Sequence, residues 1–147
     1  MRKKLWIIFV ILFAILGGKY FLFSGGASIS QSHIEGNVPE ENNFDKLLHR
    51  DIELYFTKLF KYKVIIKYEF LREGPTQTGI AYPKYYLWVK IWNGKELIKE
   101  GAIRIAAVEK THFDITNFVS KDEIINGSIN IYEIFPKPVC EKIKQYL

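Results

Sequence analysis

Residues 80–108 decide the fold of this chain, and they read IAYPKYYLWVKIWNGKELIKEGAIRIAAV. Two long segments rich in aromatic and β-branched residues flank the dipeptide Asn93-Gly94. Asn-Gly between such segments is the strongest short-range hairpin signal, because a type I′ turn needs positive φ at both central residues and these two tolerate it. The sequence therefore predicts two long antiparallel strands that meet at Asn93-Gly94.

The register of this hairpin needs one irregularity. Successive side chains of a strand point to opposite faces, and an unbroken register would place Glu100 and Arg104 among the apolar residues of the first strand. One extra residue at Gly101 removes the conflict, because it shifts the pairing so that Tyr85 faces Ile103. We therefore predict a β-bulge at Gly101.

The two faces of the predicted hairpin differ in composition. The core face carries Tyr85, Leu87, Val89, Ile91, Ile98, Ile103, Ile105 and Ala107. The opposite face carries a candidate binding surface of aromatic and cationic residues, namely Tyr82, Lys84, Tyr86, Trp88, Lys90, Trp92 and Arg104. Such residues can stack on sugars, bases or peptide side chains and attract anions. We expect the last helix to cover part of this face and the rest to remain an exposed contact surface.

Two cations of this surface, Lys84 and Arg104, lie next to each other across the predicted strands. Like charges in such positions repel. We therefore expect a nearby carboxylate or a bound anion to relieve the repulsion.

The N-terminus predicts a membrane anchor over residues 1–23. Arg2, Lys3 and Lys4 precede an apolar run over residues 5–16, and apolar residues resume after Lys19. As a helix rising about 1.5 Å per residue, residues 5–23 just span a hydrocarbon core of about 30 Å. The basic cluster keeps the amino end in the cytoplasm and places the rest outside, at an inner or plasma membrane. A signal peptide cleaved after Ala27 is the alternative.

Four of the five net positive charges lie in this N-terminal segment. Residues 1–27 hold four cations and no acidic residue, which leaves 17 basic against 16 acidic residues for the remainder. A nucleic-acid partner would need basic charge concentrated on the exported domain. We therefore predict no nucleic-acid binding.

The remaining chain divides into a flexible tether over residues 24–41 and an exported domain over residues 42–147. Gly, Ser and Pro dominate the tether. Apolar residues at helical spacing then predict a long helix that starts at an N-cap on Asn42 or Asn43. Alternation over residues 62–72 predicts a strand, and residues 109–118 continue the third strand or form a fourth.

Short helices close the predicted domain. Ser120 and Glu123 form a capping box for one that ends at Asn126-Gly127. Pro136 and Pro138 suit the start of the last, on which Cys140, the only cysteine, should be buried. Residues 129–135 fit either a short helix or an edge strand.

The fold class is thus α+β: an N-terminal transmembrane helix, then one long helix packed on a curved antiparallel sheet of three or four strands. This architecture over residues 42–147 resembles the cystatin-like and NTF2-like rolls. Some membrane-tethered NTF2-like domains act as assembly subunits of bacterial secretion machinery, and the anchor, tether and roll are similar to theirs in layout.

Motifs for catalysis are missing: the sequence has no CxxC, HExxH or GxSxG and no phosphate-binding glycine loop. We expect no catalytic residues, metal or cofactor. An acid-base enzyme or small-ligand binder of NTF2-like type is the alternative, with a pocket lined by Glu69, His112 and Asp114. A module that binds envelope polysaccharide is a second alternative.

The sequence therefore predicts a non-enzymatic single-pass protein that is held in the lipid bilayer by residues 5–23. Its extracytoplasmic domain is expected to contact a protein partner in a cell-envelope assembly, with a homo-oligomer as a further option.

Overall fold

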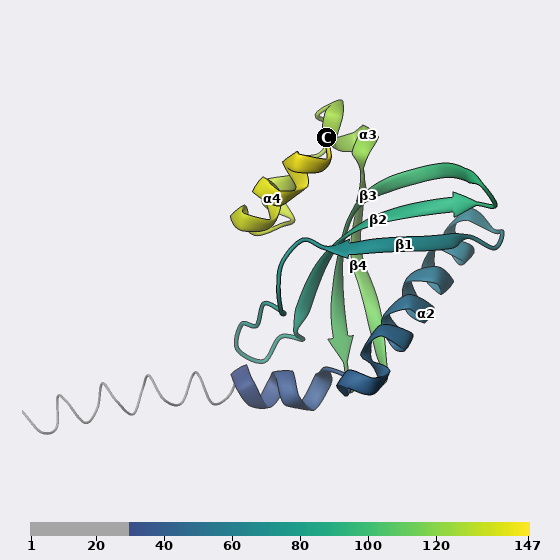
Figure 1. The fold of residues 1–147 in the computed structure, drawn as a ribbon. Coiled ribbons are helices and arrows are strands. Elements are labelled where there is room, and N and C mark those ends of the chain that lie inside the picture. Colours follow the sequence, from purple (N-terminus) through teal and green to yellow (C-terminus); the bar gives the residue numbers. More distant parts are fainter. Residues whose placement is uncertain (1–29) are drawn as a thin grey trace, which may run out of the picture.

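The long helix and the strands predicted after it are present in the computed structural model, which describes residues 30–147 (Figure 1). After a helix over residues 30–37, the chain forms α2 (Glu41–Phe60), β1 (Ile65–Phe70), β2 (Lys84–Asn93), β3 (Glu96–Val108) and β4 (His112–Ser120). Four short elements follow, α3 (Lys121–Ile125), η1 (Ile131–Glu133), α4 (Lys137–Ile143) and η2 (Lys144–Tyr146). The strands form one antiparallel sheet in the order β1-β2-β3-β4. The α+β class with one long helix and short C-terminal helices is confirmed.

The predicted anchor over residues 1–23 lies outside the described residues. Within residues 30–147, no helix combines the length and the apolar composition that crossing a bilayer requires.

The β2–β3 hairpin forms as predicted, but its turn lies one residue later. Asn93 pairs with Glu96, so Gly94 and Lys95 are the central residues of the turn. Gly94 has a φ of 59° and Lys95 has no positive φ. Glycine at the first central position with positive φ is typical of a type II′ turn, whose twist matches that of the strands as well as type I′ does.

The predicted bulge at Gly101 is wrong. Gly101 pairs regularly with Val89, and the register shifts instead between Ile91 and Trp92, where Ile98 has no partner. A shift this close to the turn sets the backbone of Lys90 opposite that of Glu100, whose carboxylate forms an ion pair with Lys121 at 3.1 Å. It also retains the predicted faces, because Tyr85 pairs with Ile105 rather than with Ile103, a difference of two residues that leaves each side chain on its face.

Gly101 is required for a different reason, the close approach of β4. It lies opposite Ser120, and a Cβ atom added to it would be 2.7 Å from Ser120 Cα and closer still to the carbonyl oxygen of Val119. No side chain fits there without displacing the β4 backbone.

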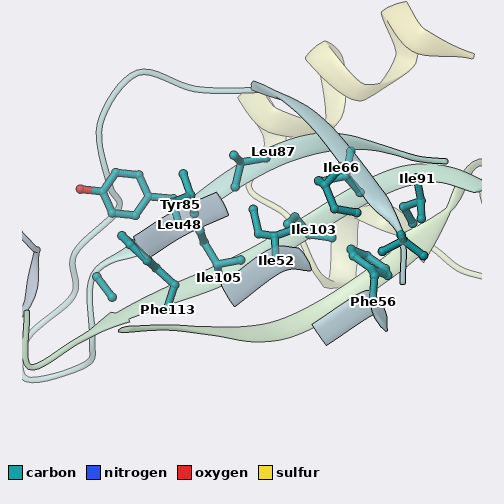
Figure 2. Packing of buried hydrophobic residues seen from close by; sticks show 13 residues of the cluster. Leu48, Ile52, Phe56, Ile66, Tyr85, Leu87, Ile91, Ile103, Ile105 and Phe113 are labelled. Atoms are coloured by element: carbon teal, nitrogen blue, oxygen red, sulfur yellow. The ribbon is translucent and has the colours of Figure 1, made fainter. Parts of the chain in front are cut away.

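The first core lies between α2 and the sheet (Figure 2). Leu48, Ile52 and Phe56 of α2 are fully buried against the sheet. The predicted core face is confirmed: Tyr85, Leu87, Val89, Ile91, Ile103, Ile105 and Ala107 are buried in this cluster, and Ile98 packs against it partly buried. Burial also raises the pKa of Tyr85 to about 12.

The second core lies on the opposite face of the sheet, beneath the C-terminal elements. Trp88 is only 1% exposed, and its ring stacks on Tyr146 with centroids 5.0 Å apart. Val139, Cys140 and Ile143 of α4 are fully buried in the same cluster, which confirms the prediction for Cys140. The sheet is therefore buried on both faces.

The capping box at the start of α3 is confirmed. The side chain of Ser120 accepts a hydrogen bond from the Glu123 N–H, and the Glu123 carboxylate accepts one from the Ser120 N–H at 2.9 Å. The Ser120 hydroxyl also donates to this carboxylate at 2.6 Å, and that bond, followed by the one from the Ser120 N–H, holds the pKa of Glu123 below its usual value. The ambiguous segment after α3 contains the short 3-10 helix η1, and α4 begins after Pro136 with Pro138 in its first turn.

Helical structure begins earlier in the chain than predicted. Glu40 is the N-cap of α2, and residues 30–37, assigned above to the tether, form a helix that docks on the β3–β4 turn. The carbonyl oxygen of Asn37 accepts from the Lys110 N–H at 2.9 Å, and its Oδ1 accepts from the Glu109 N–H at 3.1 Å. Both turn residues have positive φ, at 49° for Glu109 and 61° for Lys110, which costs energy in non-glycine residues. The bonds from Asn37 help hold the turn in this conformation.

Replacement of Gly101 by alanine should destabilise the fold, because the new methyl group collides with the β4 backbone. We expect a loss of about 1–3 kcal/mol or more in the free energy of unfolding, the usual cost of overpacking. Urea unfolding of the detergent-solubilised chain measures it. Gly36→Ala is the matched control, since a Cβ at Gly36 meets nothing within 4 Å. Equal stabilities of the two variants would contradict the close approach of β3 and β4.

Candidate functional site

The structure splits the predicted aromatic and cationic surface. Tyr86 and Trp88 are buried under the C-terminal elements, at 4% and 1% exposure, so little of either side chain is open to a partner. The cover extends further than expected because Tyr146 stacks on Trp88 and Phe135 packs edge-on against Tyr86.

Two of the predicted residues lie beyond this cover, toward the β2–β3 turn. The backbone of Lys90 lies opposite that of Glu100 on the neighbouring strand. The ammonium group of Lys67 lies above the ring of Trp92, 5.8 Å from its centroid, in a cation–π contact. Buried Trp88 separates these residues from Lys84 and Arg104 along the strands, so the seven residues do not form one continuous surface.

The remaining part of the predicted surface lines a cleft of about 380 Å³. Its walls come from the β1–β2 loop, from the start of β2, from β3 and from the segment around η1. The lining residues are Thr76, Thr78, Ala81, Tyr82, Lys84, Tyr86, Arg104, Glu133, Ile134, Phe135 and Pro136. We call this the Lys84–Arg104 cleft.

Arg104 is fixed in the wall of this cleft by bonds to two segments. Its Nε donates to Thr116 Oγ1 at 3.1 Å, and its Nη1 donates to the carbonyl oxygen of Ile134 at 2.9 Å. Thr116 lies where the β3–β4 register shifts, and its hydroxyl donates back to the carbonyl oxygen of Arg104 at 3.0 Å. None of the bonds formed within residues 30–147 uses Nη2 of Arg104, which leaves an N–H group available to a ligand.

Lys84 lies at the opposite wall, where β2 begins. Its backbone forms a two-way bridge with Thr76, with N···O distances of 2.8 and 2.9 Å. The hydroxyl groups of Thr76 and Tyr86 lie 2.7 Å apart and form a hydrogen bond beside it. The loop is therefore tied to the strand, and the side chain of Lys84 starts from a rigid position.

The cleft holds two cations without ion-pair partners. No carboxylate among the described residues lies within 4.0 Å of the ammonium of Lys84 or the guanidinium of Arg104. Glu133 also lines the cleft, and its carboxylate accepts a hydrogen bond from Asn130 at 3.1 Å. A rigid guanidinium near an ammonium and two hydroxyls suits a carboxylate or a phosphate group. The expectation that an anion relieves the repulsion stays a prediction.

The alternative pocket does not form from its three predicted residues. His112 and Asp114 are neighbours on β4, with 3.6 Å between Nε2 and Oδ1, and both line an open groove of about 690 Å³ beside α2. Glu69 lies on β1, at the other edge of the sheet, and accepts a hydrogen bond from the Tyr146 hydroxyl at 2.9 Å. Glu69 and the other two residues thus lie on opposite edge strands, with β2 and β3 between them. Across residues 30–147, no three His, Cys, Asp or Glu side chains are grouped closely enough to hold a metal ion.

Sequence reasoning missed the residues that complete the cleft from outside the hairpin. Thr76 comes from the β1–β2 loop, and Ile134 and Phe135 come from the segment after η1. The sequence carried no signal for them, because their place depends on how the C-terminal elements fold back over the sheet.

Comparison of the chain with protein-family models gives no match, and neither curated proteins nor solved structures give a significant one. The likeness to cystatin-like and NTF2-like rolls therefore stays a prediction.

Removal of the Lys84 charge should weaken anion binding in the cleft. Phosphate at about ten times its dissociation constant should add about 1.4 kcal/mol to the free energy of unfolding, measured against chloride at equal ionic strength. Lys84→Ala should lose most of this gain. Lys95→Ala, which removes an exposed lysine at the β2–β3 turn, should retain it. Equal phosphate effects in all three proteins would contradict phosphate binding through Lys84.

Proposed function

We propose that this chain is a single-pass membrane protein whose extracytoplasmic domain binds a partner protein in a cell-envelope assembly. The basic cluster of residues 2–4 and the apolar segment over residues 5–23 support the anchor and its orientation. The anchor would place the N-terminus in the cytoplasm and the domain on the outer side of an inner or plasma membrane.

The Lys84–Arg104 cleft is the observation on which the binding role rests. Arg104 is held by Thr116 and Ile134, so it loses little freedom when it binds an acceptor. Tyr82 stands half exposed in the lining of the cleft and offers an aromatic contact. An acidic side chain or terminal carboxylate of a partner fits this combination, with the flanking partner residues packed on the tyrosine.

A small anionic molecule is the second candidate for the same cleft. Its volume of about 380 Å³ is within the range of small-molecule sites. An NTF2-like ligand would instead lie between the helix and the sheet. Buried side chains of α2, β2 and β3 fill that space here (Figure 2), so the cleft on the opposite face is the better site for a ligand.

Site-specific photo-crosslinking in native membranes tests the proposal. A photoreactive residue at position 82, on the cleft, should trap a discrete partner protein. The same residue at position 62 is the matched control, because Tyr62 is equally exposed, at 42% against 45%, and precedes β1, which begins opposite Trp92 at the far end of the sheet. Mass spectrometry of the trapped product identifies the partner.

Charge reversal in the same membranes shows whether the cleft itself is responsible. Lys84→Glu should reduce the crosslink at position 82 by about tenfold, the effect of about 1.4 kcal/mol, while Lys95→Glu should leave it unchanged. Crosslinks of equal yield from positions 62 and 82, or an unchanged yield in Lys84→Glu, would contradict partner binding at the cleft.

A further inference from the structure

The β1–β2 loop presents an apolar tip to solvent. Ile80 is 81% exposed, more than any other large hydrophobic side chain that the structure describes, and Tyr82 is 45% exposed. Burial of such side chains would be favourable, yet residues 30–147 leave most of Ile80 and almost half of Tyr82 in solvent.

This tip is held in place by its own hydrogen bonds. The Ala81 N–H donates to the carbonyl oxygen of Thr78 at 3.1 Å and closes a turn around Gly79 and Ile80. The side-chain amide of Gln77 donates to the carbonyl oxygens of Gly79 and Ala81, at 2.9 and 2.6 Å. Ile80 therefore projects from a defined turn.

The tip lies at the end of the domain from which the chain leads back to the predicted anchor. Pro83 accepts a hydrogen bond from Ala107 near the end of β3, and Asn37 accepts one from Lys110 in the turn that follows. Figure 1 shows the loop and the helix over residues 30–37 at this same end, with α3 at the opposite end.

The linking chain is short. Six residues, 24–29, lie between Phe23, the last residue of the predicted anchor, and Ser30. The seven Cα–Cα steps from Phe23 to Ser30 reach about 25 Å at most when fully extended. If residues 5–23 span the bilayer, this end of the domain therefore lies close to the membrane. Tethering at such short range raises the effective concentration of the loop at the lipid surface, so a weak contact suffices.

We infer that the tip of the β1–β2 loop, residues 77–82, contacts the outer surface of the bilayer. Ile80 enters the boundary between headgroups and acyl chains, and the ring of Tyr82 lies at headgroup level, where tyrosine is enriched in membrane proteins. This inference rests on the anchor of the proposed function. It places the Lys84–Arg104 cleft, which Tyr82 also lines, beside the membrane surface.

A fluorescent label at the tip measures its depth. The full chain with Cys140→Ser carries a single new cysteine, from Ile80→Cys or from Ile125→Cys, and is reconstituted in vesicles of phosphatidylcholine and phosphatidylglycerol that contain nitroxide lipids. Ile125 is the matched control, because it is another highly exposed isoleucine, at 62%, and lies on α3 at the opposite end. Circular dichroism confirms that each labelled protein is folded.

Nitroxide quenching should be about threefold or more stronger at position 80 than at position 125, because interfacial side chains lie about 5–10 Å into the headgroup boundary. Flotation of the protein with the vesicles shows separately whether the chain is anchored in the bilayer. A chain that floats but shows equal quenching at both positions would overturn the membrane contact and leave the proposed function intact. A chain that does not float would overturn the anchor, and the membrane contact with it.

Discussion

Burial of both faces of β2 and β3 is the constraint on which the structure depends. The residues that face α2 form one core, and the alternate residues of the same strands form the other, around Trp88 and Ala102. Strand geometry links the two cores, because a shift by one residue would exchange their side chains. The bulge at Ile98 lies close to the turn, so the rest of the hairpin keeps one register. In that register, apolar side chains occupy both faces wherever the faces are covered.

This double burial also determines where the domain can bind. Over the middle of the sheet, α2 covers one face and the C-terminal elements cover the other, so neither face is open there. The C-terminal cover stops at Ile134 and Phe135, and the cleft lies where it meets the β1–β2 loop. Lys84 and Arg104 are thus half-buried at the margin of a core, on a rigid support, and their charges have no ion-pair partner within residues 30–147. The start of β2, which is tied to Thr76, also anchors the β1–β2 loop, from which Ile80 projects into solvent.

Much of the fold could be predicted from alternation and turn residues, which are local signals. They identified the hairpin, the core face and the capping box of Ser120. The register could not be derived so reliably, because Gly101 fits either a bulge or a close approach, and only the position of β4 distinguishes them. For the site, the strands indicated that Lys84 and Arg104 lie on one face and close together, but the predicted direct pair is wrong: Lys84 pairs with Ala106, and Arg104 pairs with Tyr86. The burial of Trp88 was not, since it depends on the fold of residues far along the chain, such as Tyr146.

The packing of Trp88 against Tyr146 is the most direct test of this account, because it exists only if the C-terminal elements cover the second face of the sheet. A nuclear Overhauser spectrum of the isotope-labelled chain should show cross-peaks between the two rings, whose centroids are 5.0 Å apart, and the indole N–H of Trp88 should exchange slowly with solvent. Absence of these cross-peaks, together with rapid exchange of that N–H, would contradict the double burial.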